Sequence, residues 1–296
     1  MTKVSTRAEH HIKLTEKAWW EKYGHLVERI WTYDDYLTKI VRHNYIAEMQ
    51  DFLFKPGGRL LDFGCGTGWL SLPLALRGMA VDGVDFSEVQ INRARRQAQA
   101  LGLVNTRYWC ADHVFKENYY DSVLLHAVLH HIPPEQRRSF LESISNALVP
   151  GGRLYLYEPV AATPGPPWQA WIADRFLGGV FKILYWIACK GGFYEPEIAT
   201  AMQDGWTMRS PEEQPTQLGE LINLISSFLK VVRISPWHCW SIGYANFCMS
   251  LQPVWRQRFE RAAPWFYSLD SKVRSTAWYH YLRSWPLVAI LAQKNG

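Results

Sequence analysis

The most constraining stretch of this chain is a short apolar run that ends in an acid and continues into alternating glycines. Residues 60–63 read Leu-Leu-Asp-Phe, and Gly64, Gly66 and Gly68 follow, with an apolar segment at residues 70–76 behind them. The pattern predicts a buried strand, a tight turn and a helix start. Glycine is needed where φ is positive or where a ligand lies against the main chain, and a helix start offers unpaired N–H groups. The stretch therefore predicts a turn that binds a nucleotide-type ligand.

The residues around this turn indicate which nucleotide it binds. The dinucleotide fingerprint has a small residue three positions after its second glycine, so that helix and strand pack closely. Here that position is Trp69, which is too large, and the turn contains no Gly-Lys-Ser/Thr phosphate loop. The pattern Asp-x-Gly-x-Gly-x-Gly from Asp62 to Gly68 instead resembles the first motif of class I S-adenosylmethionine (SAM) methyltransferases.

Strand and helix patterns alternate five times between residues 57 and 160. Such alternation requires a parallel sheet with right-handed crossovers. The predicted strands, in chain order, are residues 59–63, 79–84, 107–110, 120–126 and 153–157.

The segment around the fourth and fifth strands carries a second resemblance. Residues 129–134 read Leu-His-His-Ile-Pro-Pro, and after a helical pattern residues 150–159 read Pro-Gly-Gly-Arg-Leu-Tyr-Leu-Tyr-Glu-Pro. This run is similar to methyltransferases that modify small molecules, such as the ubiquinone-type and sugar O-methyltransferases. It implies an α/β, Rossmann-like fold with a seven-stranded, mostly parallel sheet and helices on both faces. It also implies SAM as the cofactor and an N-terminal helical cap. The residues beyond the fifth strand predict aromatic-rich insertions after strands five and six.

We predict one structural unit built from consecutive segments. Apolar spacing predicts helices near the N-terminus, where Tyr23 and Tyr33 are candidates to cover the cofactor. Ser210, Pro211 and Glu213 carry the signature of a helix start, as cap, first position and capping-box acid. The predicted segments are a helical cap (1–56), a SAM-binding Rossmann-like core (57–160), a lid insertion (161–208), a core helix with strand six (209–235), an aromatic-rich insertion (236–285) and the last strand (286–296).

Side chains at the strand ends are candidates to bind the cofactor. Asp85 closes the second predicted strand 21 residues after Gly64, a spacing that suits an acid for the two ribose hydroxyls. An acid after the third strand suits the exocyclic amine of adenine, as the resemblance also implies. The complete predicted set is Asp62, Gly64, Cys65, Gly66, Gly68, Asp85, Phe86 along the adenine, Asp112, His113 with a backbone N–H beside the ring, and His126, whose backbone meets the methionine end.

Candidate bases lie just past strands four and five. Histidine has an unperturbed pKa suited to proton removal near neutral pH. The resemblance implies that a histidine of the His130–His131 pair and an acid near the end of strand five face the acceptor. We predict His131 as general base, with Glu158 orienting it or binding an acceptor hydroxyl, and one histidine of the pair as structural. We predict no metal site, because these histidines and Glu158 lack a supporting ligand spacing.

Composition and charge limit the binding partners and the cellular compartment that we expect. The chain has 296 residues and a formal net charge of +5, which suits an anionic substrate or membrane surface but is too weak to indicate nucleic acid. Five scattered cysteines without metal spacing indicate a reducing compartment. Residues 1–10 lack a signal-peptide core, and we predict a cytoplasmic protein.

The second half of the chain is unusually aromatic. Ten of the 15 tryptophans lie beyond residue 160. They suit a small or amphipathic acceptor, for example a sugar or an isoprenoid phenol. They also suit peripheral membrane contact through residues 168–190 and the Trp-rich C-terminal half. Alternatively, they build the core of a helical lid. O-methylation is the leading hypothesis, with N- or C-methylation and a non-catalytic SAM-fold module as alternatives.

Overall fold

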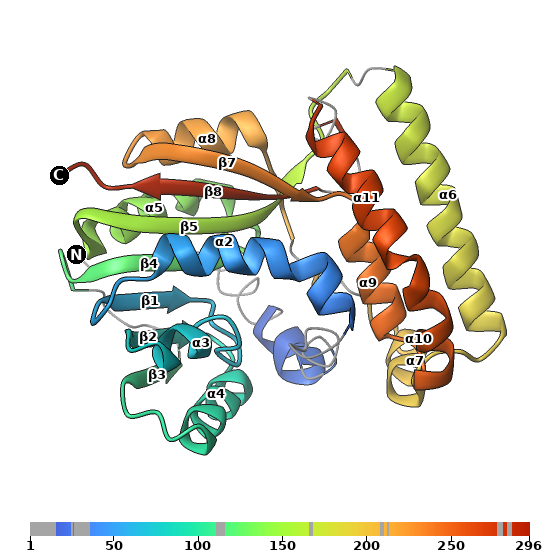
Figure 1. Cartoon of the computed structure of the whole chain (residues 1–296), viewed down its shortest axis with the longest axis horizontal. Helices are drawn as coiled ribbons and strands as arrows, with labels where there is room; N and C mark the ends of the chain where they lie inside the picture. The colour runs from blue at the N-terminus through green and yellow to red at the C-terminus, as the bar shows by residue number, and fades with distance from the viewer. Residues whose placement is uncertain are drawn as a thin grey trace.

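The computed structural model describes residues 16–24, 26, 36–110, 116–165, 168–207, 210–211, 213–276, 281–282 and 286–296. A central sheet is flanked by helices, and a layer of further helices stands at one end of it (Figure 1). The arrows of β1 and β4 point toward this helical layer, so the carboxyl ends of these strands meet it.

The sheet confirms the predicted Rossmann-like topology. Its order is β3-β2-β1-β4-β5-β8-β7, and β8 runs antiparallel to both neighbours while β1 to β5 pair in parallel. A short additional strand, β6, pairs with the end of β5. The strands are β1 (Arg59–Phe63), β2 (Ala80–Asp85), β3 (Thr106–Cys110), β4 (Tyr120–His126), β5 (Leu148–Ala161), β6 (Thr216–Gln217), β7 (Lys230–His238) and β8 (Leu287–Gln293).

Helices cover both faces of the sheet because successive strand residues point to opposite sides. Leu60 packs in a cluster with α2 and α3, whereas Leu61 packs in a cluster with α5 and α8. A third cluster joins α4 to the underside of the glycine turn through Ile91 and Cys65. The helices are α2 (His43–Leu53), α3 (Leu72–Leu76), α4 (Glu88–Ala100), α5 (Pro134–Ala147) and α8 (Leu218–Ser226).

The helix predicted to start at Ser210 is absent, since residues 213–215 are irregular and α8 begins only at Leu218. Pro215 explains the difference, because a proline disfavours helical φ and ψ in the residue before it. The capping-box bond still forms, with Ser210 N–H donating to Glu213 Oε1 over 2.8 Å. The Ser210 hydroxyl, however, is used elsewhere in the fold.

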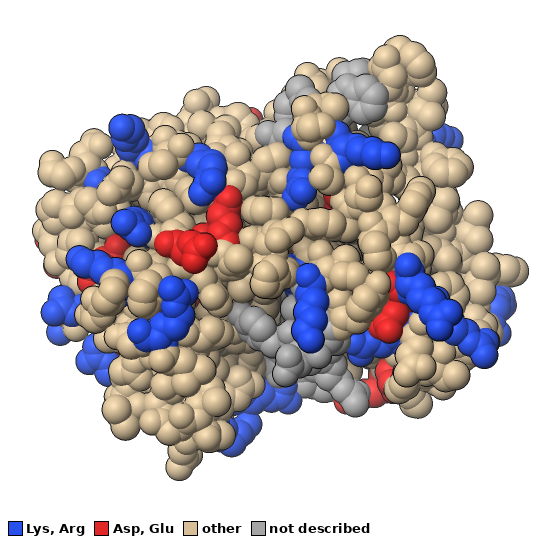
Figure 2. Space-filling model, viewed as in Figure 1, with Lys and Arg blue, Asp and Glu red and all other residues tan. Residues whose placement is uncertain are grey.

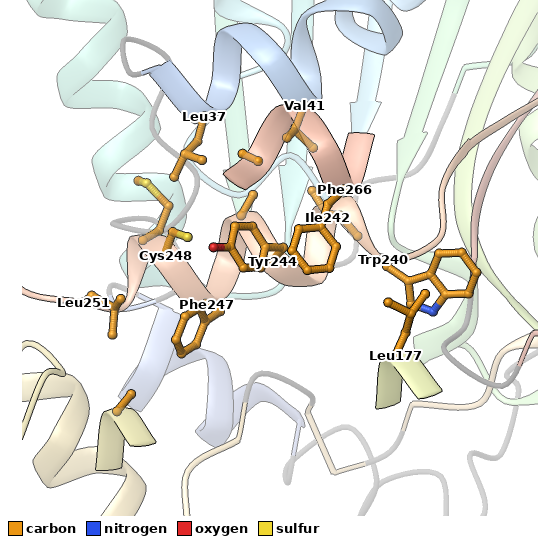
Figure 3. Close-up of a cluster of buried hydrophobic side chains, with 14 of the residues drawn as sticks. Leu37, Val41, Leu177, Trp240, Ile242, Tyr244, Phe247, Cys248, Leu251 and Phe266 are labelled. Atoms are coloured by element: carbon orange, nitrogen blue, oxygen red, sulfur yellow. The ribbon is translucent and has the colours of Figure 1, made fainter. Parts of the chain in front are cut away.

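The two insertions pack on one another to form the helical layer. Its core is aromatic, with Phe181 of α6 5.6 Å from Phe266 of α11 and Tyr244 of α9 stacked on Phe266 at 4.1 Å (Figure 3). The interpretation that the aromatics build a helical lid therefore accounts for many of them. The layer consists of η1 (Thr38–Arg42), α6 (Trp168–Lys190), α7 (Pro196–Gln203), α9 (Ser241–Met249), α10 (Pro253–Phe259), η3 (Glu260–Ala262) and α11 (Ala263–Arg274).

A buried carboxylate joins this layer to the sheet. Asp270 of α11 is fully buried and accepts the backbone N–H groups of Cys239, Trp240 and Ser241, together with the Ser241 hydroxyl. Burial raises the pKa of Asp270, and these donors oppose the rise. Asp270 thus satisfies the N–H groups of the turn that leads into α9, including that of its first residue, Ser241, which has no partner inside the helix.

Candidate active site

The glycine turn has the backbone that its sequence predicted. Gly64, Gly66 and Gly68 have φ values of +74°, +52° and +74°, which L-residues with a side chain rarely adopt. A Cβ on Gly64 would lie 2.4 Å from Val128 Cγ2, whereas a Cβ on Gly66 would meet nothing within 4 Å. Gly64 is therefore needed for close packing, and the main chain at Gly66 lies open for a ligand.

Asp85 lies directly beside this turn. Its carboxylate accepts Gly66 N–H and Ser87 N–H, each over 2.9 Å. Burial raises the pKa of Asp85, while the N–H donors and nearby His131 oppose the rise. The carboxyl end of β2 and the glycine turn therefore come together at one edge of the sheet.

Asp62, the acid of the first motif, lies beneath the turn. It is buried, and burial raises its pKa to about 7; a hydrogen bond from Ser71 opposes the rise and nearby Asp85 adds to it. Cys65 is also buried, and its N–H donates to Val84 O over 3.0 Å. Phe86 follows Asp85 and its carbonyl oxygen lies 3.5 Å from Cys110 Sγ. Asp112 and His113 lie outside the described residues.

His126 lies at the end of β4 in a stack of aromatic rings. Its ring is parallel to that of Tyr157 at 4.7 Å and meets Trp69 edge-on at 5.7 Å. Burial lowers the pKa of His126 to about 3, so the imidazole is neutral at physiological pH. Trp69, which excluded the dinucleotide fingerprint, thus helps to pack the strand end that faces the turn.

Glu158 contacts His130, not His131 as predicted. Its carboxylate lies 2.7 Å from His130 Nδ1 and accepts the N–H groups of Val128 and Leu129 over 2.7 and 2.6 Å. Burial alone would raise the pKa of Glu158, but His130 and these N–H groups bring it below its usual value. Glu158 therefore holds the short helix η2 (Leu129–His131) and fixes the orientation of His130.

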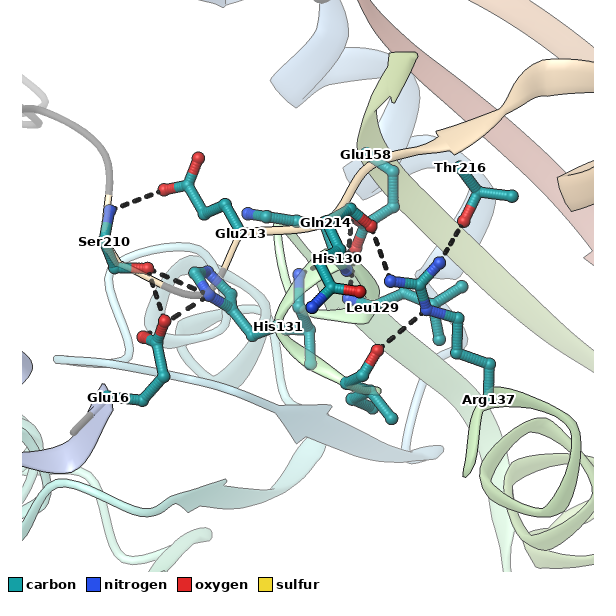
Figure 4. A network of polar contacts seen from close by, with 12 residues as sticks. Glu16, Leu129, His130, His131, Arg137, Glu158, Ser210, Glu213, Gln214 and Thr216 are labelled. Atoms are coloured by element: carbon teal, nitrogen blue, oxygen red, sulfur yellow. Dashed lines mark hydrogen bonds and ion pairs between the residues drawn. The ribbon is translucent and has the colours of Figure 1, made fainter. Parts of the chain in front are cut away.

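His131 is oriented by residues from two distant parts of the chain. Its Nδ1 lies 3.2 Å from Ser210 Oγ and 3.5 Å from Glu16 Oε2, and Ser210 Oγ donates to Glu16 Oε1 over 2.9 Å (Figure 4). The Trp20 ring meets the imidazole edge-on at 6.2 Å. Sequence reasoning did not identify Glu16, and it identified Ser210 only as a helix cap.

The N-terminal helical segment, residues 16–24, covers this edge of the sheet. A Cβ on Gly24 would lie 2.4 Å from Gln90 Nε2 of α4, so the segment packs closely on the helix that follows Asp85. Tyr23 lies 6.3 Å from Trp206, ring to ring, which joins the segment to the first insertion. Tyr33, the other aromatic proposed to cover the cofactor, lies outside the described residues.

Comparison with known proteins agrees with this geometry. A family model described as a methyltransferase domain matches residues 60–152. Ubiquinone biosynthesis O-methyltransferase of Aeromonas salmonicida is 30% identical over 157 residues, which are 50% of this chain and 63% of the relative. The Coxiella burnetii protein of the same name is 31% identical over 140 residues, 46% of this chain and 55% of the relative. The chain thus spans little more than half of the length of these relatives.

Solved structures share the fold at low sequence identity. The 1,6-didemethyltoxoflavin-N1-methyltransferase of Burkholderia thailandensis superposes with a TM-score of 0.56 at 15% identity, covering 100% of this chain and 93% of that one. For geranyl diphosphate C-methyltransferase of Streptomyces coelicolor the TM-score is 0.51 at 15% identity, with 85% and 78% covered. The chain therefore has the fold of class I SAM-dependent methyltransferases, and its residues 60–152 match a methyltransferase domain.

Proposed function

We propose that the chain transfers a methyl group from SAM to an oxygen of a small or lipid-linked acceptor, of the sugar or isoprenoid-phenol type. The observation that carries this proposal is an open left-handed glycine turn bonded to Asp85, with His131 held by the same segment, residues 16–24, that packs on the helix after Asp85. The ubiquinone O-methyltransferases among the relatives support an isoprenoid phenol as acceptor.

The residues present fit SAM. The main chain at Gly66 is open, and Asp85 lies next to it at the end of β2, where a ribose is bound in related folds. When bound, SAM supplies a methyl group on a sulfonium, which needs no further activation. Asp62, Gly64, Cys65, Gly66, Gly68, Asp85, Phe86 and the backbone at His126 are the described residues that we propose to hold it, with Asp112 and His113 as further candidates.

His131 is the proposed general base. Ser210 and Glu16 both lie at its Nδ1, so they hold the ring in place while Nε2 takes the proton from an acceptor hydroxyl. His130 and Glu158 are positioning residues in this scheme, because their bond fixes η2 and thereby the backbone of His131. Orientation of the acceptor supplies much of the rate, and the base about 10²–10⁴-fold more.

Binding and turnover variants test the two parts separately. Wild-type protein is expected to bind S-adenosylhomocysteine (SAH) in calorimetry and to methylate a phenol from a panel with and without isoprenoid tails. His131→Ala is expected to reduce turnover by about 10²–10⁴-fold with little change in SAH affinity. His43→Ala, an exposed histidine on α2, is the matched control and keeps its activity.

Each contrary result has a definite meaning. Turnover largely retained in His131→Ala would indicate N- or C-methylation, which needs no strong base. Absence of SAH binding by the wild-type protein would indicate a module that does not use SAM.

We further propose that α6 lies on a membrane surface from which a lipid-linked acceptor enters. No helix within the described residues is long and apolar enough to cross a membrane. The outward face of α6 nevertheless exposes large apolar side chains, including Trp168 (68%), Phe176 (66%) and Trp186 (62%). The right-hand edge of the molecule, where α6 lies in Figure 1, is largely free of acidic side chains in Figure 2.

The charges on α6 favour an anionic surface. Arg175, Lys182 and Lys190 are exposed on the same helix as the aromatic side chains. Basic and aromatic side chains together suit the headgroup region of an anionic bilayer.

Vesicle flotation at low salt tests this contact. The wild-type protein is expected to float with vesicles that contain phosphatidylglycerol. The double variant Phe176→Asp/Trp186→Asp is expected to lose at least about tenfold in partitioning, because two charges replace exposed rings that would insert into the bilayer. Val104→Asp/Val232→Asp is the matched control, since both valines are exposed apolar residues outside α6. The membrane proposal is contradicted if the wild-type protein does not bind the vesicles, or if partitioning of the control variant decreases as much as that of the double variant.

A further inference from the structure

Three metal-binding side chains converge at the edge where the acceptor would bind. His130 and His131 lie on η2, and Glu213 comes from the segment before α8. One donor atom from each residue lies within 4.8 Å of the others. Figure 4 shows His131 and Glu213 on the same side of Ser210, with Glu16 below them.

The tautomer of His130 favours metal binding. Its Nδ1 lies 2.7 Å from Glu158 Oε2. Because Nδ1 is hydrogen-bonded to this carboxylate, Nε2 is the ring nitrogen left to face a metal ion. A histidine that donates one ring N–H to a carboxylate is the usual arrangement of a metal ligand, because the bond fixes the ring and increases its basicity.

The charge of the surroundings also favours a cation. Glu16 and Glu158 are 4% and 2% exposed, and Glu213 is half-buried beside them. Arg137 is a buried cation near Glu158, but its guanidinium donates to Ile132 O, Gln214 O and Thr216 Oγ1. The three carboxylates outnumber this arginine, and buried charge is costly unless it is compensated.

We propose that His130, His131 and Glu213 bind a divalent transition-metal ion of the Zn²⁺ type. Two imidazole nitrogens and one carboxylate oxygen suit Zn²⁺, whereas Mg²⁺ and Ca²⁺ favour oxygen ligands. Donors around a tetrahedral Zn²⁺ are roughly 3.3 Å apart, so the set must contract slightly, and the half-buried Glu213 side chain can supply that movement by rotation. Three protein ligands leave a fourth position for an acceptor oxygen or water.

The catalytic role of this metal site rests on the proposed function, whereas metal binding itself does not. A cation bound through His131 would occupy one of its nitrogens and would itself polarise an acceptor hydroxyl. Metal-loaded protein would then depend on the cation rather than on a free imidazole for proton removal.

Metal titration of the full, tag-free chain tests the proposal. One equivalent of Zn²⁺ is expected to bind in calorimetry, and Co²⁺ is expected to show the visible absorption of a low-symmetry site with nitrogen ligands. Glu213→Gln is expected to weaken binding of both ions at least about tenfold, because glutamine keeps the Ser210 hydrogen bond but removes the charge. Glu142→Gln, an exposed glutamate on α5, is the matched control with wild-type affinity.

SAH titration of the same samples separates the two proposals. Wild-type metal affinity in Glu213→Gln, or no stoichiometric binding by the wild-type protein, overturns the metal site. If SAH still binds in that case, the methyltransferase proposal stands. Metal binding without SAH binding would instead leave the metal site and overturn the proposed function.

Discussion

Gly64→Ala is expected to abolish SAH binding. The variant would place a Cβ 2.4 Å from Val128 Cγ2 at a residue whose φ is +74°. Val128 cannot retreat easily, because its N–H is held by Glu158 over 2.7 Å. A left-handed alanine costs about 1–2 kcal/mol, and an overpacked contact about 1–3 kcal/mol more. The turn is therefore expected to move, and the ligand site moves with it.

A second glycine separates the backbone cost from the steric one. Gly78 has a φ of +96°, but a Cβ there would meet nothing within 4 Å. Gly78→Ala should lose stability without losing SAH affinity. Adding Val128→Ala to Gly64→Ala removes the overlapping methyl group and should recover part of the affinity. Calorimetry measures all four proteins, and wild-type affinity in Gly64→Ala would contradict the packing argument.

Asp270→Ala is expected to lower the free energy of unfolding by at least about 3 kcal/mol. The substitution leaves the N–H groups of Cys239, Trp240 and Ser241 buried without their acceptor, and each buried unsatisfied group costs about 1–3 kcal/mol. That loss is a large part of the total stability of a typical domain, about 5–15 kcal/mol. Because Asp270 joins α11 to the end of β7, the helical layer should be lost first.

Urea unfolding followed by circular dichroism measures this effect. Asp51→Ala is the matched control, since Asp51 is exposed on α2 and such a change normally stays within about 0.5 kcal/mol. A free energy of unfolding in Asp270→Ala equal to that of the control would show that Asp270 does not hold the layer to the sheet.

Local patterns predicted the core of the fold correctly. The apolar strands β1 and β2 and the helix α4, with its Ser87 cap bonded to Gln90 N–H, depend on neighbouring residues that the sequence places together. The hairpin of β7 and β8 was also predicted, although the second insertion separates its strands. The helix predicted at Ser210 was wrong because Pro215 prevents it, and that proline was visible in the sequence.

The candidate site could be predicted only in part. Gly64 to Gly68 and Asp85 were identified because motif spacing reports on the backbone of a single turn. The sequence did not identify His130 as the partner of Glu158. Two adjacent histidines offer the same chemistry, and only the backbone of η2 decides which of them contacts the carboxylate. Glu16 carries no local signal, and Glu213 was identified only as a capping-box acid; both reach the vicinity of His131 through tertiary packing.

The sequence by itself determined the glycine turn and the sheet edge around it, where the methyl donor SAM would bind. The glycine turn and the alternating strands depend on contacts between residues that are close in the sequence, so their pattern can be read from the sequence directly. The tertiary structure alone decided the proposed acceptor side, where Glu16, His131, Ser210 and Glu213 meet from three separate segments. Such a cluster exists only after long-range packing has paid the entropy of bringing those segments together, so no spacing rule can reveal it.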